Sequence, residues 1–204
     1  KRFTSNNKVF VIPNGIDLNS IKKLIKLKKN QNNRKFIISI RGLTKLYRIH
    51  EILLSRANME KSLKIPIKFI YPFYEESYKK SLNKLFISED DDISRLSKID
   101  MYKYFMEAKL VISIPYSDSS PRSVYEAIFC GAIVAISYNN YYENLPDSLK
   151  ARVIIVDINQ KDWFYNAINK AGDLLKEDFI PCNKALRQFD QDQTFKEMAK
   201  IIFK

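Results

Sequence analysis

Short apolar runs alternate along the chain with longer segments in which apolar residues recur every three or four positions. The short runs are rich in Val, Ile and Phe, and each is predicted to form a β-strand. Within these runs apolar residues follow one another instead of strictly alternating with polar ones, which indicates strands covered on both faces. The predicted strands span 9–12, 36–40, 67–71, 110–114, 132–136 and 153–156.

The longer segments have the spacing of amphipathic helices. At 98–108, for example, Ile99, Tyr102, Phe105 and Met106 are expected on one helix face. Strands that alternate with helices of this length predict βαβ units and a parallel sheet. The predicted fold class is therefore α/β, one Rossmann-like domain with helices on both faces of the sheet. The other predicted helices span about 48–61, 75–86, 122–130, 160–177 and 183–203.

Two local signals refine this pattern. Gly131 is expected to stop the helix at 122–130, because glycine commonly ends helices. The segment SEDDDISRLS at 88–97 is expected to be an exposed acidic loop in which Asp90, Asp91 and Asp92 are solvated.

Composition excludes several classes of protein. The 204 residues are 46% hydrophobic and 28% charged, which is ordinary for a globular domain and excludes a disordered chain. No apolar run is long enough to span a bilayer, and no signal peptide is evident, so we expect a cytoplasmic location, at most peripheral to the inner face of a membrane. Cys130 and Cys182 lie too far apart for a metal or redox motif, and Cys130 is expected to be buried. With His50 as the single histidine, a Ser/His/Asp triad or a His-based metal site is improbable.

Positive charge is concentrated in the first third of the chain. Residues 1–70 hold 17 Lys and Arg against 3 Asp and Glu, although the whole chain has a net charge of +12. This asymmetry suggests an anionic partner, and it leaves open an alternative function as a non-catalytic basic module that binds nucleic acid or another polyanion. Nucleic acid is the weaker candidate, because no nucleic-acid-binding motif is found. A lysine-rich composition bias would explain the asymmetry equally well.

A basic segment at 20–35 raises a second partner hypothesis. Ile21, Leu24 and Ile25 can share one helical face, which is surrounded by Lys22, Lys23, Lys26 and Lys29. Such a segment could contact an anionic membrane. The alternative is a solvated surface helix.

Ligands of open parallel sheets bind outside the carboxyl ends of the strands. Arg41, Lys45 and Arg48 follow the strand at 36–40, and three cations at this position can hold a diphosphate. The alternative is a solvated basic turn.

The loop after the strand at 110–114 also has polar candidates. Pro121 can sit in the first turn of the next helix with Ser119 or Ser120 as its cap, and the free N–H groups of that turn would suit a phosphate. Glu126 lies one turn further in, among apolar neighbours, so its carboxylate needs a partner. A ribose diol would satisfy it, and so would a salt bridge to Lys or Arg.

Four motifs in order resemble the glycosyltransferase group 1 family. They are VIPNGID at 11–17, Arg41 after a strand, the stretch at 110–137, and SYNNYYENLP at 137–146. The third contains Asp118 and Glu126 with seven residues between them, and this spacing of two acidic residues is the family's signature.

The resemblance implies a GT-B fold and a retaining transfer of sugar from a nucleotide-diphosphate sugar to a glycan or lipid-linked acceptor. Residues 1–204 would be the C-terminal, nucleotide-sugar-binding domain, with the acceptor domain absent, so the chain alone is expected to bind donor and to transfer sugar poorly. Family members hold the donor with cations and a helix N-terminus, without a metal, so the resemblance implies no metal and no cofactor. The base pocket is expected near 88–96.

The resemblance also implies roles for residues. Glu126 would bind the ribose, Asp118, which replaces the usual Glu, would lie near the donor sugar, and Arg41 would bind phosphate. Either Lys45 or Arg48 would be the partner of Arg41. The implied catalytic residues are Asp118, Arg41 and Lys45. The implied donor-binding residues are Gly15, Arg41, Lys45, Arg48, Ser119, Ser120, Pro121, Arg122, Ser123, Val124 and Glu126.

Overall fold

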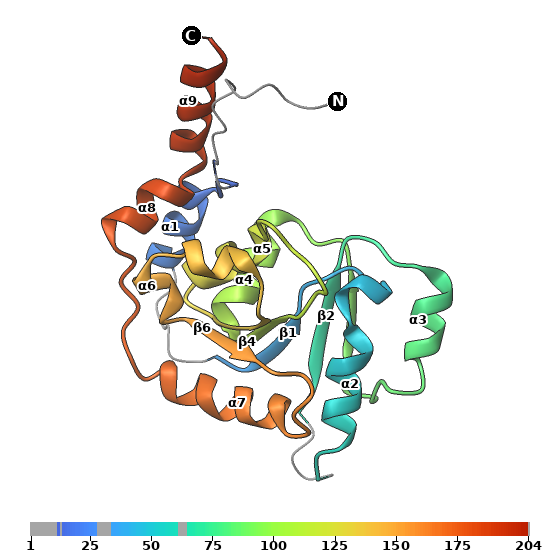
Figure 1. The fold of residues 1–204 in the computed structure, drawn as a ribbon. Helices are drawn as coiled ribbons and strands as arrows, with labels where there is room; N and C mark the ends of the chain where they lie inside the picture. The colour runs from blue at the N-terminus through green and yellow to red at the C-terminus, as the bar shows by residue number, and fades with distance from the viewer. Residues whose placement is uncertain (1–11, 13, 28–33, 61–64, 204) are drawn as a thin grey trace.

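One parallel sheet forms the centre of the molecule (Figure 1). The computed structural model describes residues 12, 14–27, 34–60 and 65–203. Six strands pair in the order β3-β2-β1-β4-β5-β6, and every pair is parallel. This is the strand order of a Rossmann fold, so the predicted fold class is confirmed. The strands are β1 (Phe36–Ser39), β2 (Ile67–Tyr71), β3 (Asp91–Ser94), β4 (Ala108–Ser113), β5 (Ile133–Ser137) and β6 (Val153–Val156).

Helices cover both faces of the sheet, as the continuous apolar runs predict. Alternate strand residues point to opposite faces, so Ile37 and Ile38 of β1 belong to different core clusters. One cluster is completed by α1 (Leu18–Leu27), α4 (Lys98–Glu107), α5 (Arg122–Phe129), α6 (Asp147–Lys150) and α8 (Asn183–Phe189). The other is completed by α2 (Ile49–Ala57), α3 (Glu76–Leu82) and α7 (Trp163–Leu174).

The expected acidic loop at 88–97 contains a strand, so this prediction was wrong. Residues of β3 pair with β2 from Lys68↔Asp91 to Tyr71↔Ser94. β3 lies at the edge of the sheet and is largely exposed, and its sequence DDIS has no apolar run. Pairing with β2, together with contacts from Lys68 to Asp91 and from the Tyr71 hydroxyl to Asp92, overrides the low strand propensity of Asp.

Asp90 is not solvated, which corrects a second prediction. Its side chain is 3% exposed and forms an ion pair with Arg56, which is 1% exposed. The Nη2 of Arg56 lies 2.7 Å from Oδ2 of Asp90. The two carboxylate oxygens of Asp90 also accept hydrogen bonds from the backbone N–H groups of Ile67 and Ile87. The pair therefore fastens α2 to the chain on both sides of α3.

The predicted helix at 183–203 is two helices, α8 and α9 (Gln191–Ile202), with the break at Asp190. The backbone of Ile16 accepts from Gln191 N–H and donates to the carbonyl of Phe189, and this pairing interrupts the helical hydrogen bonds. The Asp190 carboxylate then caps α9 through the N–H groups of Asp192 and Gln193. α9 consequently extends away from the sheet (Figure 1).

The structure also bears on the expectations for Gly131, Ile99 and Cys130. Gly131 ends α5 with a φ of 83°, a left-handed conformation that favours glycine, so the predicted stop is confirmed. Ile99 is 41% exposed, so it does not join the buried face of α4. Cys130 is buried, as expected. The predicted strand at 9–12 falls almost entirely outside the described residues.

The apolar face of α1 packs against the protein core. Ile21 is buried, and Leu24 and Ile25 pack against the core cluster that contains α4 and α5. Lys29 lies outside the described residues. In the described part of the chain, no helix combines the length and the apolar character needed to cross a bilayer.

We expect the substitution Asp90→Ala to lower the free energy of unfolding by about 3–5 kcal/mol, because it leaves the buried Arg56 guanidinium without its counter-charge. The matched control Asp91→Ala removes an exposed carboxylate of the same acidic run and should change that free energy by less than about 1 kcal/mol. Urea unfolding of both variants measures the difference. Equal losses of unfolding free energy in the two variants would contradict the stabilising role of the ion pair between Asp90 and Arg56.

Candidate functional site

A cavity of about 570 Å³ opens at the carboxyl edge of the sheet, where β1 and β4 lie side by side. The strand order reverses between these two strands, and such switch points are where open α/β sheets bind ligands. The loop from β4 to α5 forms one wall of the cavity. The lining residues are Arg41, Tyr47, Ser117, Asp118, Ser119, Ser120, Pro121, Arg122, Ser123 and Glu126.

Arg41 and Asp118, two of the predicted site residues, form an ion pair in this cavity. Nη2 of Arg41 donates to Oδ2 of Asp118 at 2.7 Å, and Nε donates to the Ser113 hydroxyl at 2.6 Å. The guanidinium also lies over the ring of Tyr47, 5.6 Å from its centroid. Arginine has five N–H donors, so three of them have no partner among the described residues.

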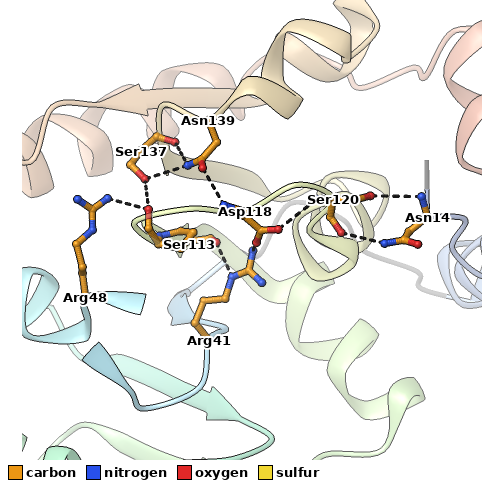
Figure 2. Close-up of polar contacts among 9 residues, drawn as sticks. Asn14, Arg41, Arg48, Ser113, Asp118, Ser120, Ser137 and Asn139 are labelled. Carbon is orange, nitrogen blue, oxygen red and sulfur yellow. Dashed lines mark hydrogen bonds and ion pairs between the residues drawn. The ribbon is translucent and has the colours of Figure 1, made fainter. Parts of the chain in front are cut away.

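The loop that carries Asp118 is fixed at several points (Figure 2). Oδ1 of Asp118 accepts from the N–H of Ser120 at 3.2 Å, and the N–H of Asp118 donates to Oδ1 of Asn139 at 2.9 Å. Asn14, on the segment before α1, makes two 3.3 Å hydrogen bonds to Ser120. The loop therefore joins three parts of the chain that are far apart in the sequence.

The N-terminus of α5 has no side-chain cap. Pro121 itself is the N-cap residue, so the expected caps Ser119 and Ser120 are not used. The Pro121 carbonyl accepts from the N–H groups of Val124 and Tyr125. In the described part of the chain, the N–H groups of Arg122 and Ser123 make no such bond, and both residues line the cavity. Uncapped N–H groups at a helix N-terminus favour an anion.

Glu126 reaches the same cavity from the second turn of α5. It is 5% exposed, and its Oε1 accepts from the Tyr102 hydroxyl at 3.0 Å, with the Lys98 ammonium 3.9 Å away. Burial raises the pKa of Glu126, and the Tyr102 hydrogen bond and the Lys98 charge oppose that rise. Its partners among the described residues are therefore the Tyr102 hydroxyl and, at the longer distance of 3.9 Å, the Lys98 ammonium. Oε2 accepts no hydrogen bond from a described residue.

The structure does not bring Arg48 or Lys45 to the cavity. Arg48 donates to the carbonyls of Ile114 and Pro115 at 2.6 and 3.0 Å, and its guanidinium lies over the Tyr116 ring. Its φ of 53° is left-handed, which is uncommon for a non-glycine residue. Lys45, in the short helix η1 (Lys45–Tyr47), is exposed and does not line the cavity. Arg48 therefore supports the loop after β4 and does not line the cavity.

Gly15 and Val124 also lie elsewhere. A Cβ on Gly15 would lie 2.4 Å from the Thr194 hydroxyl and 2.5 Å from the Cα of Gln191, so glycine is required for close packing on α9. The Val124 side chain is fully buried in the core. Neither residue lines the cavity, and their predicted contact with a ligand stays a prediction.

A second cavity of about 330 Å³ adjoins the first at the ends of β1 and β2. The two cavities share Arg41, Tyr47 and Ser123. Tyr71, Phe73 and Leu96 make its walls largely apolar, and Arg95 and Leu96 of its lining lie within the range 88–96 predicted for the base pocket. That pocket stays a prediction, but the structure offers a space at this position.

Sequence reasoning missed the residues that hold the site together. Ser113, Tyr102 and Asn139 act through contacts with residues far away in the chain, which no local pattern reveals. Tyr47 has a local signal, because it lies between the candidate phosphate-binding residues Lys45 and Arg48. Tyr141, in η3 (Asn140–Asn144), is 5% exposed, and its hydroxyl has no partner among the described residues.

Comparison with known proteins identifies the fold. No family profile and no curated protein matches the sequence. Among solved structures, Anabaena HepE in complex with UDP and glucose has a TM-score of 0.70 at 15% identity, over 95% of this chain and 56% of that chain. Trehalose-phosphate synthase from Burkholderia xenovorans has a TM-score of 0.69 at 14% identity, over 95% and 51%. Sucrose-phosphate synthase from Thermosynechococcus elongatus has a TM-score of 0.68 at 10% identity, over 94% and 51%.

These matches show that the chain has the fold of one Rossmann-like half of a GT-B structure. The chain spans about half the length of each of these proteins.

Glu126 generates a pH-dependence of stability. Because burial raises its pKa, the folded state holds this proton at a higher pH than the unfolded state does, so stability falls as the pH rises. The substitution Glu126→Gln keeps an oxygen for the Tyr102 hydroxyl but cannot ionise. We expect it to be more stable than the unaltered chain at pH 7, with the advantage lost below about pH 4.3, the pKa of an unperturbed Glu.

Urea unfolding midpoints from pH 4 to pH 8 measure this effect. The control Glu197→Gln changes an exposed glutamate on α9 and should follow the unaltered chain at every pH. An advantage of Glu126→Gln that is the same at pH 4 and pH 7 would exclude the buried charge as its source.

Proposed function

We propose that this chain is the donor-binding, C-terminal half of a glycosyltransferase. It would hold a nucleotide-diphosphate sugar whose sugar passes, with retention, to a glycan or lipid-linked acceptor. The observation that carries this proposal is the convergence of Arg41, the uncapped N-terminus of α5 and the buried Glu126 on one cavity at the switch point of a GT-B-type sheet. The fold likeness to HepE, solved with UDP and glucose, supports it.

The diphosphate would bind between Arg41 and the first turn of α5. The three unpartnered guanidinium N–H groups are suited to phosphate oxygens, and the N–H groups of Arg122 and Ser123 add the partial positive charge of a helix N-terminus. Both groups of donors line the same cavity.

The nucleoside would extend from the diphosphate past Glu126. A ribose diol has two hydroxyl donors, and Oε2 of Glu126 is an acceptor without a partner among the described residues. The adjoining cavity with the rings of Tyr71 and Phe73 has the apolar character that a base requires. The diphosphate and ribose would then lie in the first cavity, and the base in the adjoining cavity.

The reaction would break the bond between the anomeric carbon and the diphosphate oxygen. Negative charge then develops on the leaving phosphate, and fixed N–H donors and a guanidinium would stabilise it there. Asp118, which holds Arg41, would lie beside the transferred sugar. We expect the acceptor site to belong to a second domain, because the chain spans about half the length of the similar structures, so the chain alone should bind donor without efficient transfer.

The first test is a calorimetric titration of this chain with UDP, GDP and ADP. We expect one of them to bind saturably, and Arg41→Ala to weaken it at least about tenfold through loss of a charge-assisted contact. Lys45→Ala removes a cation four residues away that faces solvent, and it should change the affinity by less than about twofold.

Equal losses in the two variants would contradict the assignment of Arg41, because they would indicate general electrostatic attraction. A single-stranded oligonucleotide in the same titration tests the alternative function. Tight binding that weakens steeply with salt would favour the polyanion-binding module over the donor-binding half.

A further inference from the structure

The side chain of Asn139 links the loop after β5 to the loop that carries Asp118 (Figure 2). Its Oδ1 accepts from the backbone N–H of Asp118 at 2.9 Å. Its Nδ2 donates to the carbonyl of Ser137 at 3.1 Å. Asn139 is 8% exposed, so water does not compete freely for either bond.

This geometry requires both halves of the amide. An Asp at this position would keep the acceptor for the Asp118 N–H but would set a carboxylate oxygen against the Ser137 carbonyl. An Ala would leave a partly buried N–H and a buried C=O without these partners, and such groups are costly to leave unpaired. The position therefore selects asparagine by hydrogen-bonding chemistry rather than by size.

The other contacts on this loop hold residues before Asp118, or Ser120 after it, which bonds to Asn14. Arg48 donates to Ile114 and Pro115, and the Ser137 hydroxyl donates to the Pro115 carbonyl at 2.9 Å. Among the described residues, Asn139 is the one whose side chain bonds the backbone of Asp118 itself. The Asp118 carboxylate in turn holds the Arg41 guanidinium.

We propose that Asn139 is a positioning residue of the donor site, which orients the Asp118 carboxylate so that Arg41 points its remaining N–H groups toward the diphosphate. The inference rests on the proposed function. Asn139 does not line the cavity and acts through Asp118, so its contribution depends on the carboxylate of that residue.

A double-mutant cycle tests this dependence. Calorimetry with UDP, GDP and ADP identifies the nucleotide that binds, and the cycle uses that nucleotide. We expect Asn139→Ala to weaken its binding by about five- to tenfold, and by less than about twofold when Asp118→Ala is already present. Asn140→Ala, an exposed asparagine at the next position, is the matched control and should stay within about twofold in both backgrounds.

Hydrogen exchange of the Asp118 amide gives a readout that needs no ligand. Asn139→Ala should speed that exchange about tenfold or more, and Asn140→Ala should leave it unchanged. Unchanged exchange in Asn139→Ala would overturn the proposal, and so would an affinity loss of the same size with and without the Asp118 carboxylate. If the unaltered chain binds none of the three nucleotides, the proposed function fails, and the exchange result alone decides whether Asn139 holds Asp118.

Discussion

The parallel pairing of β1 with β4 is the constraint on which the site depends. The chain adds β2 and β3 on one side of this pair and β5 and β6 on the other, so the connections after β1 and β4 diverge and leave a crevice between them. Arg41 and Asp118 follow these two strands and meet in that crevice, although 76 residues separate them in the sequence. Ser113 ends β4, and its short side chain lets the Arg41 guanidinium approach the strand end and bond it.

Arg41 and Arg48 carry the same charge, but backbone conformation gives them different roles. Arg41 and Arg48 follow the same strand and are equal candidates on charge. At Arg48 the backbone takes a left-handed conformation, and its guanidinium is used by the carbonyls of Ile114 and Pro115. Those carbonyls lie just after the end of β4, and the Pro115 carbonyl also accepts from the Ser137 hydroxyl. One arginine therefore stabilises the wall of the cavity and the other faces its interior.

The sequence predicts the elements whose apolar pattern is complete, and it misses those that long-range pairing creates. The bounds of β2 and β6 match their apolar runs, because most residues of both strands are buried. β3 has no such run and exists through its pairing with β2. The break between α8 and α9 is imposed by Ile16, which lies at the other end of the chain. At the site, the spacing of Asp118 and Glu126 is a local signal, whereas Asn139 and Tyr102 become visible only when the chain is folded.

The residues that line the cavity do not share the net positive charge of the chain. The chain has a net charge of +12, yet the cavity lining contains two cations, Arg41 and Arg122, and two acidic residues, Asp118 and Glu126. The general excess of lysine therefore does not create a strongly positive cavity. Recognition of an anion there must come from directed donors, namely the free N–H groups of Arg41 and the uncapped turn of α5. Such donors are effective only when their geometry is held, because a misplaced N–H gains little from a nearby phosphate. A site of this kind depends on the residues that fix its loops as much as on the residues that touch the ligand.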